Sequence, residues 1–136
     1  MHYYQSKRSR LSGTNYREVR AHAKAIFSHI EKKTKRSPYI RSAYFDNQKV
    51  FFHFFWPHLM QKSHKERVRR LRYFAAAVDL IRKTRNKPVV LHNPMKTREL
   101  FYRFGGQTKE KELFYVQIKT DARTHKKYLM SVFPKN

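Results

Sequence analysis

The chain has no cysteine, few acidic residues and no long apolar run. The absence of cysteine excludes a disulfide framework and any zinc site built on thiolates, and it fits a reducing compartment. No segment approaches the roughly 18 consecutive apolar residues that a membrane-spanning helix needs. Residues 1–8 carry charge but no apolar segment follows them, which excludes a secretory signal. These absences predict a cytoplasmic protein.

The scarcity of acidic residues leaves a large positive charge. Asp and Glu number 9 against 32 Lys and Arg, so the formal net charge is +23. Such a charge repels itself within a folded protein unless a polyanion neutralises it, and each neutralised phosphate releases counterions. Aromatic residues make up 15% of the 136 residues, which argues against a disordered basic tail. We therefore expect one folded domain whose partner is RNA, with DNA or an acidic protein as alternatives and a membrane surface disfavoured.

Hydrophobic periodicity predicts two main helices. Apolar residues at helical spacing, such as Val19, Ala23 and Phe27, predict a helix over about 14–33. The Ser-x-x-Glu pattern at 63–66 predicts the start of a second helix that continues to about 85. We expect residues 1–13 to form a basic N-terminal arm, either mobile or a short extra element, and residues 14–136 to form a single domain.

The remaining segments predict strands. Two aromatic runs on either side of the turn-forming residues 46–49 predict a β-hairpin. The C-terminal half predicts an antiparallel four-stranded meander. The expected fold class is therefore α+β, with two main helices packed on one face of an antiparallel sheet and an extra hairpin between the helices. The expected strands are 39–45 and 50–56 in the hairpin, then 88–92, 97–104, 113–120 and 126–133.

Several kinds of enzyme have little support in the sequence because their motifs are missing. The chain lacks HExxH, P-loop and GxSxG patterns, its carboxylates form no cluster of the two-metal type, and its eight histidines are scattered. We expect no metal and no cofactor. Metal-free RNA cleavage remains possible, because RNA supplies its own nucleophile in the 2′-hydroxyl. That reaction needs a base, an acid and cations around the phosphate, and side chains of those types are abundant here.

Four short motifs resemble a known family. The chain resembles the barnase, EndoU, colicin and RelE group of toxin nucleases, most of all its phage-associated and mobile-element branches, over about residues 20–134. The resemblance implies a metal-independent endoribonuclease, a toxin of a toxin–antitoxin or phage-defence system that an acidic antitoxin holds in check. The hairpin over 39–56 departs from the minimal pattern of the group. The motifs are Ser-His-Ile-Glu-Lys-Lys at 28–33, Arg-Phe-Gly-Gly-Gln-Thr at 103–108, Phe-Tyr-Val-Gln-Ile-Lys at 114–119 and Tyr-Leu-Met-Ser-Val-Phe-Pro at 128–134.

The resemblance also implies where a catalytic site would lie. It points to a helical histidine, His29, and to Ser131 before the closing aromatic-proline pair. Strand alternation separately places Gln117 and Lys119 on the face opposite Val116 and Ile118. The candidate catalytic residues are His29, Arg103, Gln117, Lys119 and Ser131, with Arg103 stabilising transition-state charge.

Alternatives remain open for the histidine and for the RNA contacts. His22, one heptad before His29, is the substitute for it, and His53 in the hairpin is assigned to packing. The basic face of the second helix contacts either RNA or solvent. A non-catalytic RNA- or DNA-binding module of a larger ribonucleoprotein would explain the charge equally well. The candidate RNA-binding residues are Lys32, Lys33, Arg36, Arg67, Arg69, Arg70 and Thr108.

Overall fold

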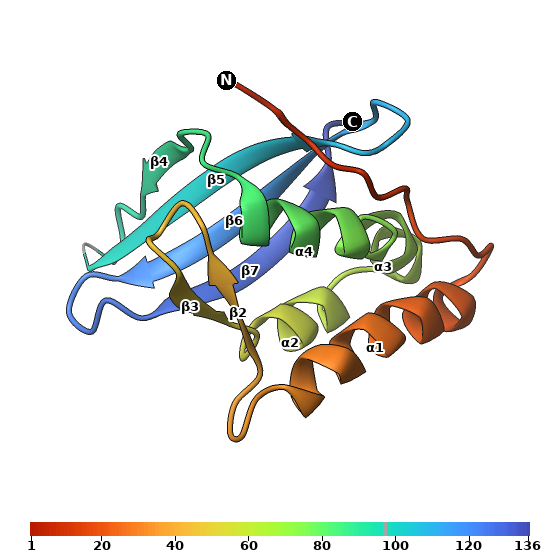
Figure 1. Cartoon of the computed structure of the whole chain (residues 1–136), viewed down its shortest axis with the longest axis horizontal. Coiled ribbons are helices and arrows are strands. Elements are labelled where there is room, and N and C mark those ends of the chain that lie inside the picture. The colour runs from red at the N-terminus through yellow and green to blue at the C-terminus, as the bar shows by residue number, and fades with distance from the viewer. Residues whose placement is uncertain (97) are drawn as a thin grey trace.

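Seven strands form one mixed sheet, curled into a half-barrel, in the computed structural model, which describes residues 1–96 and 98–136 (Figure 1). The order along the sheet is β1-β5-β6-β7-β3-β2, and β4 pairs with β5 beside β1. Strands β4 to β7 pair antiparallel, whereas β1 pairs parallel with β5 and β3 pairs parallel with β7. The strands are β1 (Tyr4–Gln5), β2 (Tyr39–Ser42), β3 (Gln48–Phe51), β4 (Val89–His92), β5 (Glu99–Gln107), β6 (Leu113–Asp121) and β7 (Lys127–Pro134).

Four helices within the described residues gather on one side of this sheet (Figure 1). Asn15 caps the first of them by accepting a hydrogen bond from the backbone N–H of Glu18, and Ser63 caps the third in the same way through Glu66. The core lies between the helices and the sheet and includes Phe74 and Val116. The helices are α1 (Tyr16–Lys32), α2 (Phe55–Met60), α3 (His64–Leu71) and α4 (Phe74–Lys83).

The predicted fold class is wrong. Two helices on a four-stranded antiparallel sheet were expected, and the structure has four short helices on a seven-stranded mixed sheet. The helix predicted over 63–85 is divided at Arg72 and Tyr73 into α3 and α4. Only Leu71 is buried in α3, whereas α4 is buried on most of its surface. A surface helix and a core helix need different positions relative to the sheet, and the chain turns between them.

The predicted hairpin is present, but both of its strands are shorter than expected, and the first, β2, ends at Ser42. Strand β3 ends at Phe51, and residues predicted as its continuation form α2. Pro57 lies in the first turn of α2, where a backbone N–H has no helical partner to lose. The strand predicted to begin at Thr97 has its first residue outside the described residues, and β5 begins at Glu99.

The N-terminal segment contributes β1 to the sheet. The Tyr4 hydroxyl and the Ser6 Oγ donate hydrogen bonds to Asp79 Oδ2 at 3.0 and 2.7 Å. Burial is the largest cause that raises the pKa of Tyr4 to about 12, and the hydrogen bond to Asp79 contributes to the same rise. Burial alone would raise the pKa of Asp79, but hydrogen bonds from Ser6, Lys83 and Tyr4 outweigh it, so this pKa lies below its usual value. Asp79 thus attaches the start of the chain to α4.

Candidate nucleic-acid interface

The face of the sheet away from the helices combines aromatic rings with cations. Alternation along β6 turns Tyr115, Gln117 and Lys119 to this face, while Val116 and Ile118 are buried under the helices. We call the aromatic side chains on this face and at its edge the aromatic track. The track consists of two groups of rings, and within each group every ring lies within 6.3 Å of a neighbouring ring: Tyr3, Tyr115 and Phe133 form the first, and Phe54, Tyr128, Phe51 and Tyr39 form the second.

An arginine–glutamine pair lies in the middle of the face. Arg103 of β5 donates from Nε and Nη2 to Gln117 Oε1 of β6 at 3.3 and 3.1 Å. The same guanidinium lies 5.5 Å from the Phe133 ring centroid and 5.8 Å from that of Tyr115. Arg70 of α3 lies 5.5 Å from the Phe133 centroid as well. Two guanidinium groups from different elements therefore converge on one aromatic ring.

Ser131 lies beside this pair, at a pocket between the helices and β7 whose volume of about 10 Å³ is enough for about one water molecule. It is the register partner of Gln117, next to a β-bulge in the β6–β7 pairing, and it is 7% exposed. Ser131 shares its pocket with His58 of α2 and Arg70 of α3. The structure thus brings together three of the predicted site residues, Arg103, Gln117 and Ser131, and adds a histidine that was not predicted.

His58 has the electrostatic surroundings of a proton acceptor. Burial lowers the pKa of His58, and the positive charges of Lys62 and Arg70 lower it further. A histidine with a pKa below its usual value is neutral near pH 7 and can accept a proton. His58 was missed because the sequence indicated no helix or strand between residues 57 and 62. Only the packing of α2 against β7 brings His58 beside Ser131 and Arg70.

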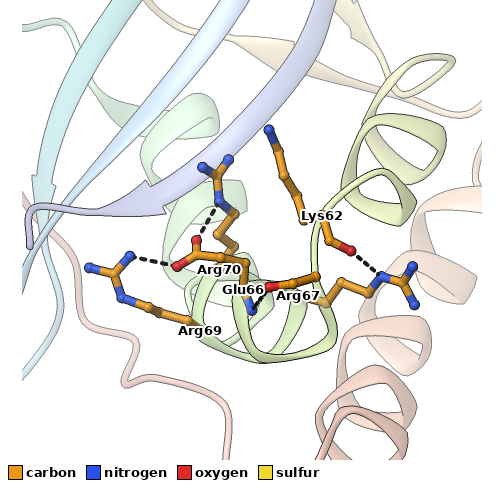
Figure 2. A network of polar contacts seen from close by, with 6 residues as sticks. Lys62, Glu66, Arg67, Arg69 and Arg70 are labelled. Atoms are coloured by element: carbon orange, nitrogen blue, oxygen red, sulfur yellow. Dashed lines mark hydrogen bonds and ion pairs between the residues drawn. The ribbon is translucent and has the colours of Figure 1, made fainter.

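The three arginines of α3 make different contacts, and Glu66 accepts hydrogen bonds from only two of them. Figure 2 shows its carboxylate accepting from Arg69 and Arg70, at 2.9 and 3.1 Å. The hydrogen bond from Arg70 is the main reason that the pKa of Glu66 is lowered. Arg67 points the other way and donates to the backbone carbonyl of Lys62 at 3.0 Å (Figure 2). It also donates to the backbone carbonyl of Met60 at 2.6 Å. Arg67 therefore joins α3 to α2, and Arg70 is the arginine of this helix that reaches the Phe133 ring.

A basic groove lies at the other end of the aromatic track. The groove has a volume of about 640 Å³ and no carboxylate among its lining residues. Lys49 places its ammonium 4.7 Å from the Tyr39 ring centroid, so cations and rings alternate here too. Lys32 is exposed at the end of α1, next to the predicted residue Lys33. The lining consists of Lys33, Lys35, Arg36, Ser37, Tyr39, Lys49, Phe51 and Lys126.

Lys119 lies between the two ends of the face. Its ammonium donates to Glu99 Oε1 at 3.2 Å and lies 4.5 Å from the Phe54 ring centroid. His53 packs near Phe51 and Tyr128, with ring centroids at 5.5 and 5.6 Å. Lys119 thus interacts both with the Glu99 carboxylate and with the Phe54 ring of the aromatic track.

Other predicted residues lie elsewhere. His29 and His22 are on α1, which packs against α3, α4 and β2, and the His22 ring is 3.4 Å from Ser12 Oγ. Thr108 is fully buried, and its hydroxyl is engaged by Glu112, donating to the carboxylate and accepting from the backbone N–H, both at 3.2 Å. The sequence treated the helical histidine and the strand residues as one site. In the structure His29 is exposed on α1, which packs mainly against α3, α4 and β2, whereas the strand residues lie on β5, β6 and β7.

No known protein family, curated protein or solved structure matches this chain. Membership in the toxin nuclease group therefore stays a prediction from the sequence motifs. Within residues 1–96 and 98–136, no group of three or more His, Asp or Glu side chains is arranged to hold a metal ion. No helix in the described part of the chain is both long and apolar enough to cross a membrane.

Proposed function

We propose that this protein binds single-stranded RNA along the aromatic track and cleaves it without a metal beside His58, Arg70 and Ser131. The observation that carries the proposal is the meeting of these three side chains in one pocket, next to the pair of Arg103 and Gln117. A neutral imidazole, a hydroxyl and guanidinium groups are the kinds of group that the cleavage of RNA requires.

The aromatic track supports the choice of unpaired RNA. Rings on an open sheet face stack on bases only when those bases are not paired, and every base has a face to offer. The guanidinium groups of Arg70 and Arg103 can each hold a phosphate through two parallel hydrogen bonds. The basic groove supplies further cations at the other end of the track. A strand lying on these rings would pass the pocket of His58.

The proposed reaction uses the 2′-hydroxyl of the substrate. His58 accepts its proton, the 2′-oxygen attacks phosphorus, and the bond from phosphorus to the 5′-oxygen breaks. The leaving oxygen takes a proton from water, so the products are a 2′,3′-cyclic phosphate and a 5′-hydroxyl. Arg70 and Arg103 stabilise the charge on the phosphate oxygens, and Ser131 and Gln117 position the phosphate. This assigns to His58 the role that the sequence motifs suggested for His29.

Single-turnover cleavage of total RNA in EDTA tests the proposal. His58→Ala should lower the rate constant by about 10² to 10⁴, the usual contribution of one positioned proton-transfer group. RNA affinity should hardly change, because one neutral imidazole adds little beside 32 cations. His29→Ala and His22→Ala are the matched controls and should retain full activity. Full activity of the His58 variant, or loss in the His29 variant instead, would refute this assignment.

A non-catalytic RNA-binding module is the second candidate. The hydrogen bonds between Arg103 and Gln117 favour it, because they complete a binding face that needs no histidine. It predicts retention of single-stranded RNA without any 2′,3′-cyclic phosphate product. Absence of that product in the unaltered protein, together with salt-dependent binding, would select this candidate.

A toxin held in check by an acidic protein is the role that the resemblance of the sequence motifs implied. An acidic partner would compete with RNA for the cations of the basic groove and the face. Expression of the protein in the bacterial cytoplasm should then arrest growth, and His58→Ala should relieve the arrest. Unchanged growth arrest with this variant would show that the toxicity does not depend on cleavage at His58.

A further inference from the structure

A second cavity lies on the helix side of the sheet, away from the aromatic track. It has a volume of about 410 Å³ and lies between the β2–β3 turn and the ends of β5, β6 and β7. Thr120 of β6 and Lys127 of β7 lie opposite each other in the strand register. The preceding pair in the register, Lys119 and Tyr128, faces the aromatic track on the other side of the sheet. The lining includes one carboxylate, that of Asp46, which is exposed at the rim of the cavity. The lining residues that the argument uses are Tyr44, Phe45, Tyr102, Thr120, His125 and Lys127.

Lys127 is a buried cation without an anion. It is 7% exposed and donates to the backbone carbonyl of His125 at 3.1 Å. Among the residues that the structure describes, no carboxylate lies within ion-pair distance of its ammonium. Burial lowers the pKa of Lys127, as expected when an ammonium group loses water. Burying an ammonium without a negative partner is costly, so an anion that enters the cavity would be stabilised there.

Thr120 adds an unused hydrogen-bonding group. It is 5% exposed, and its Oγ1 has no hydrogen-bond partner in the described structure. A buried hydroxyl without a partner is rare, because it has lost its water without a replacement. Its strand partner Lys127 places a second donor next to it. Two neighbouring donors suit the two oxygens of one carboxylate.

Aromatic rings form the apolar part of the cavity. Phe45 meets Tyr44 and Tyr102 edge to face, in each case with ring centroids 5.0 Å apart. The Lys127 ammonium lies 4.9 Å from the Phe45 centroid. A flat ring can pack against these side chains through the same edge-to-face contacts. The volume lies within the range of pockets that bind small organic molecules.

We propose that this cavity binds a small aromatic carboxylate. The carboxylate accepts hydrogen bonds from Lys127 Nζ and Thr120 Oγ1, and the ring packs against Phe45, Tyr44 and Tyr102. The site is independent of RNA binding, because it uses the opposite side of the sheet.

Benzoate is the probe, and two-dimensional NMR of the full chain is the measurement. Saturable chemical-shift changes should be confined to the residues around the cavity. Benzamide, which has the same shape without the charge, should bind at least about tenfold more weakly, since a charged hydrogen bond contributes roughly 1.5–3 kcal/mol. Lys127→Met should abolish the saturable changes, and the nearly isosteric Thr120→Val should weaken binding by about tenfold. Arg123→Met removes an exposed charge from the same β6–β7 turn and should leave the affinity unchanged.

Three outcomes would overturn the proposal. Absence of saturable shifts would mean that the cavity holds only water. An equal effect of Arg123→Met and Lys127→Met would mean diffuse attraction of anions to the net charge. Binding of uridine in place of benzoate would make the cavity a site for an unpaired base. If Lys127→Met does not fold, Thr120→Val decides, and unchanged benzoate affinity in that variant refutes the site.

Discussion

Replacing three cations of the basic groove should flatten the salt dependence of RNA binding. Lys33, Arg36 and Lys49 line this groove, together with Lys35 and Lys126. Each cation that neutralises a phosphate of single-stranded RNA contributes about −0.7 to the slope of log affinity against log salt. The five groove cations alone therefore predict a slope of about −3.5, and the triple change to Gln should leave about −1.4.

These slopes are readily measured by fluorescence anisotropy with a labelled single-stranded oligonucleotide. Counting only the groove cations, affinity should fall between 50 and 200 mM salt by roughly 100-fold for the unaltered protein and by only about sevenfold for the triple variant. Phosphate contacts outside the groove, such as those of Arg70 and Arg103, would steepen both slopes equally. The matched control changes Arg85, Lys87 and Lys109 to Gln, three exposed cations outside the groove, which removes the same net charge. Equal flattening in the control would refute the argument, because binding would then follow net charge instead of the groove.

Three further changes test the face, the reaction and the fold. Phe133→Leu removes the ring between Arg70 and Arg103 and should weaken binding to single-stranded RNA by about tenfold, as loss of one stacking platform does; unchanged affinity would take this ring out of the interface. The cleavage rate constant should rise with pH through a pKa below the usual 6.5, because His58 accepts a proton only when it is neutral. Arg70→Gln removes a positive charge that lowers this pKa and should therefore move the rise in rate to higher pH. An unmoved pH profile in this variant would contradict the role of His58. Asp79→Asn should lower the free energy of unfolding by about 2–3 kcal/mol at pH 7 in urea denaturation. Because the folded pKa of Asp79 is depressed, this stability is present above about pH 4 and is lost as the pH falls through the folded pKa, so equal effects at pH 7 and pH 2 would be inconsistent with the carboxylate as its source.

Local patterns in the sequence were sufficient for several elements of the site. Alternation along 113–120 predicted a strand with Gln117 and Lys119 on one face, and β6 has that arrangement. The Ser63 and Glu66 pattern predicted a helix start that the capping hydrogen bond reproduces. These features depend on neighbours within a few residues, so the order of amino acids is enough to specify them.

Contacts between distant segments decided the rest. The parallel pairing of β1 with β5 and of β3 with β7 joins strands far apart in the sequence, and no local pattern specifies such a register. The change from strand to helix at Phe55 arises where that side chain enters the core, so packing outweighs the preference of aromatic residues for strands. His58 reaches Arg70 and Ser131 only through that packing. The sequence by itself determined a basic chain with a polar and aromatic strand face, and tertiary structure determined which histidine lies beside it.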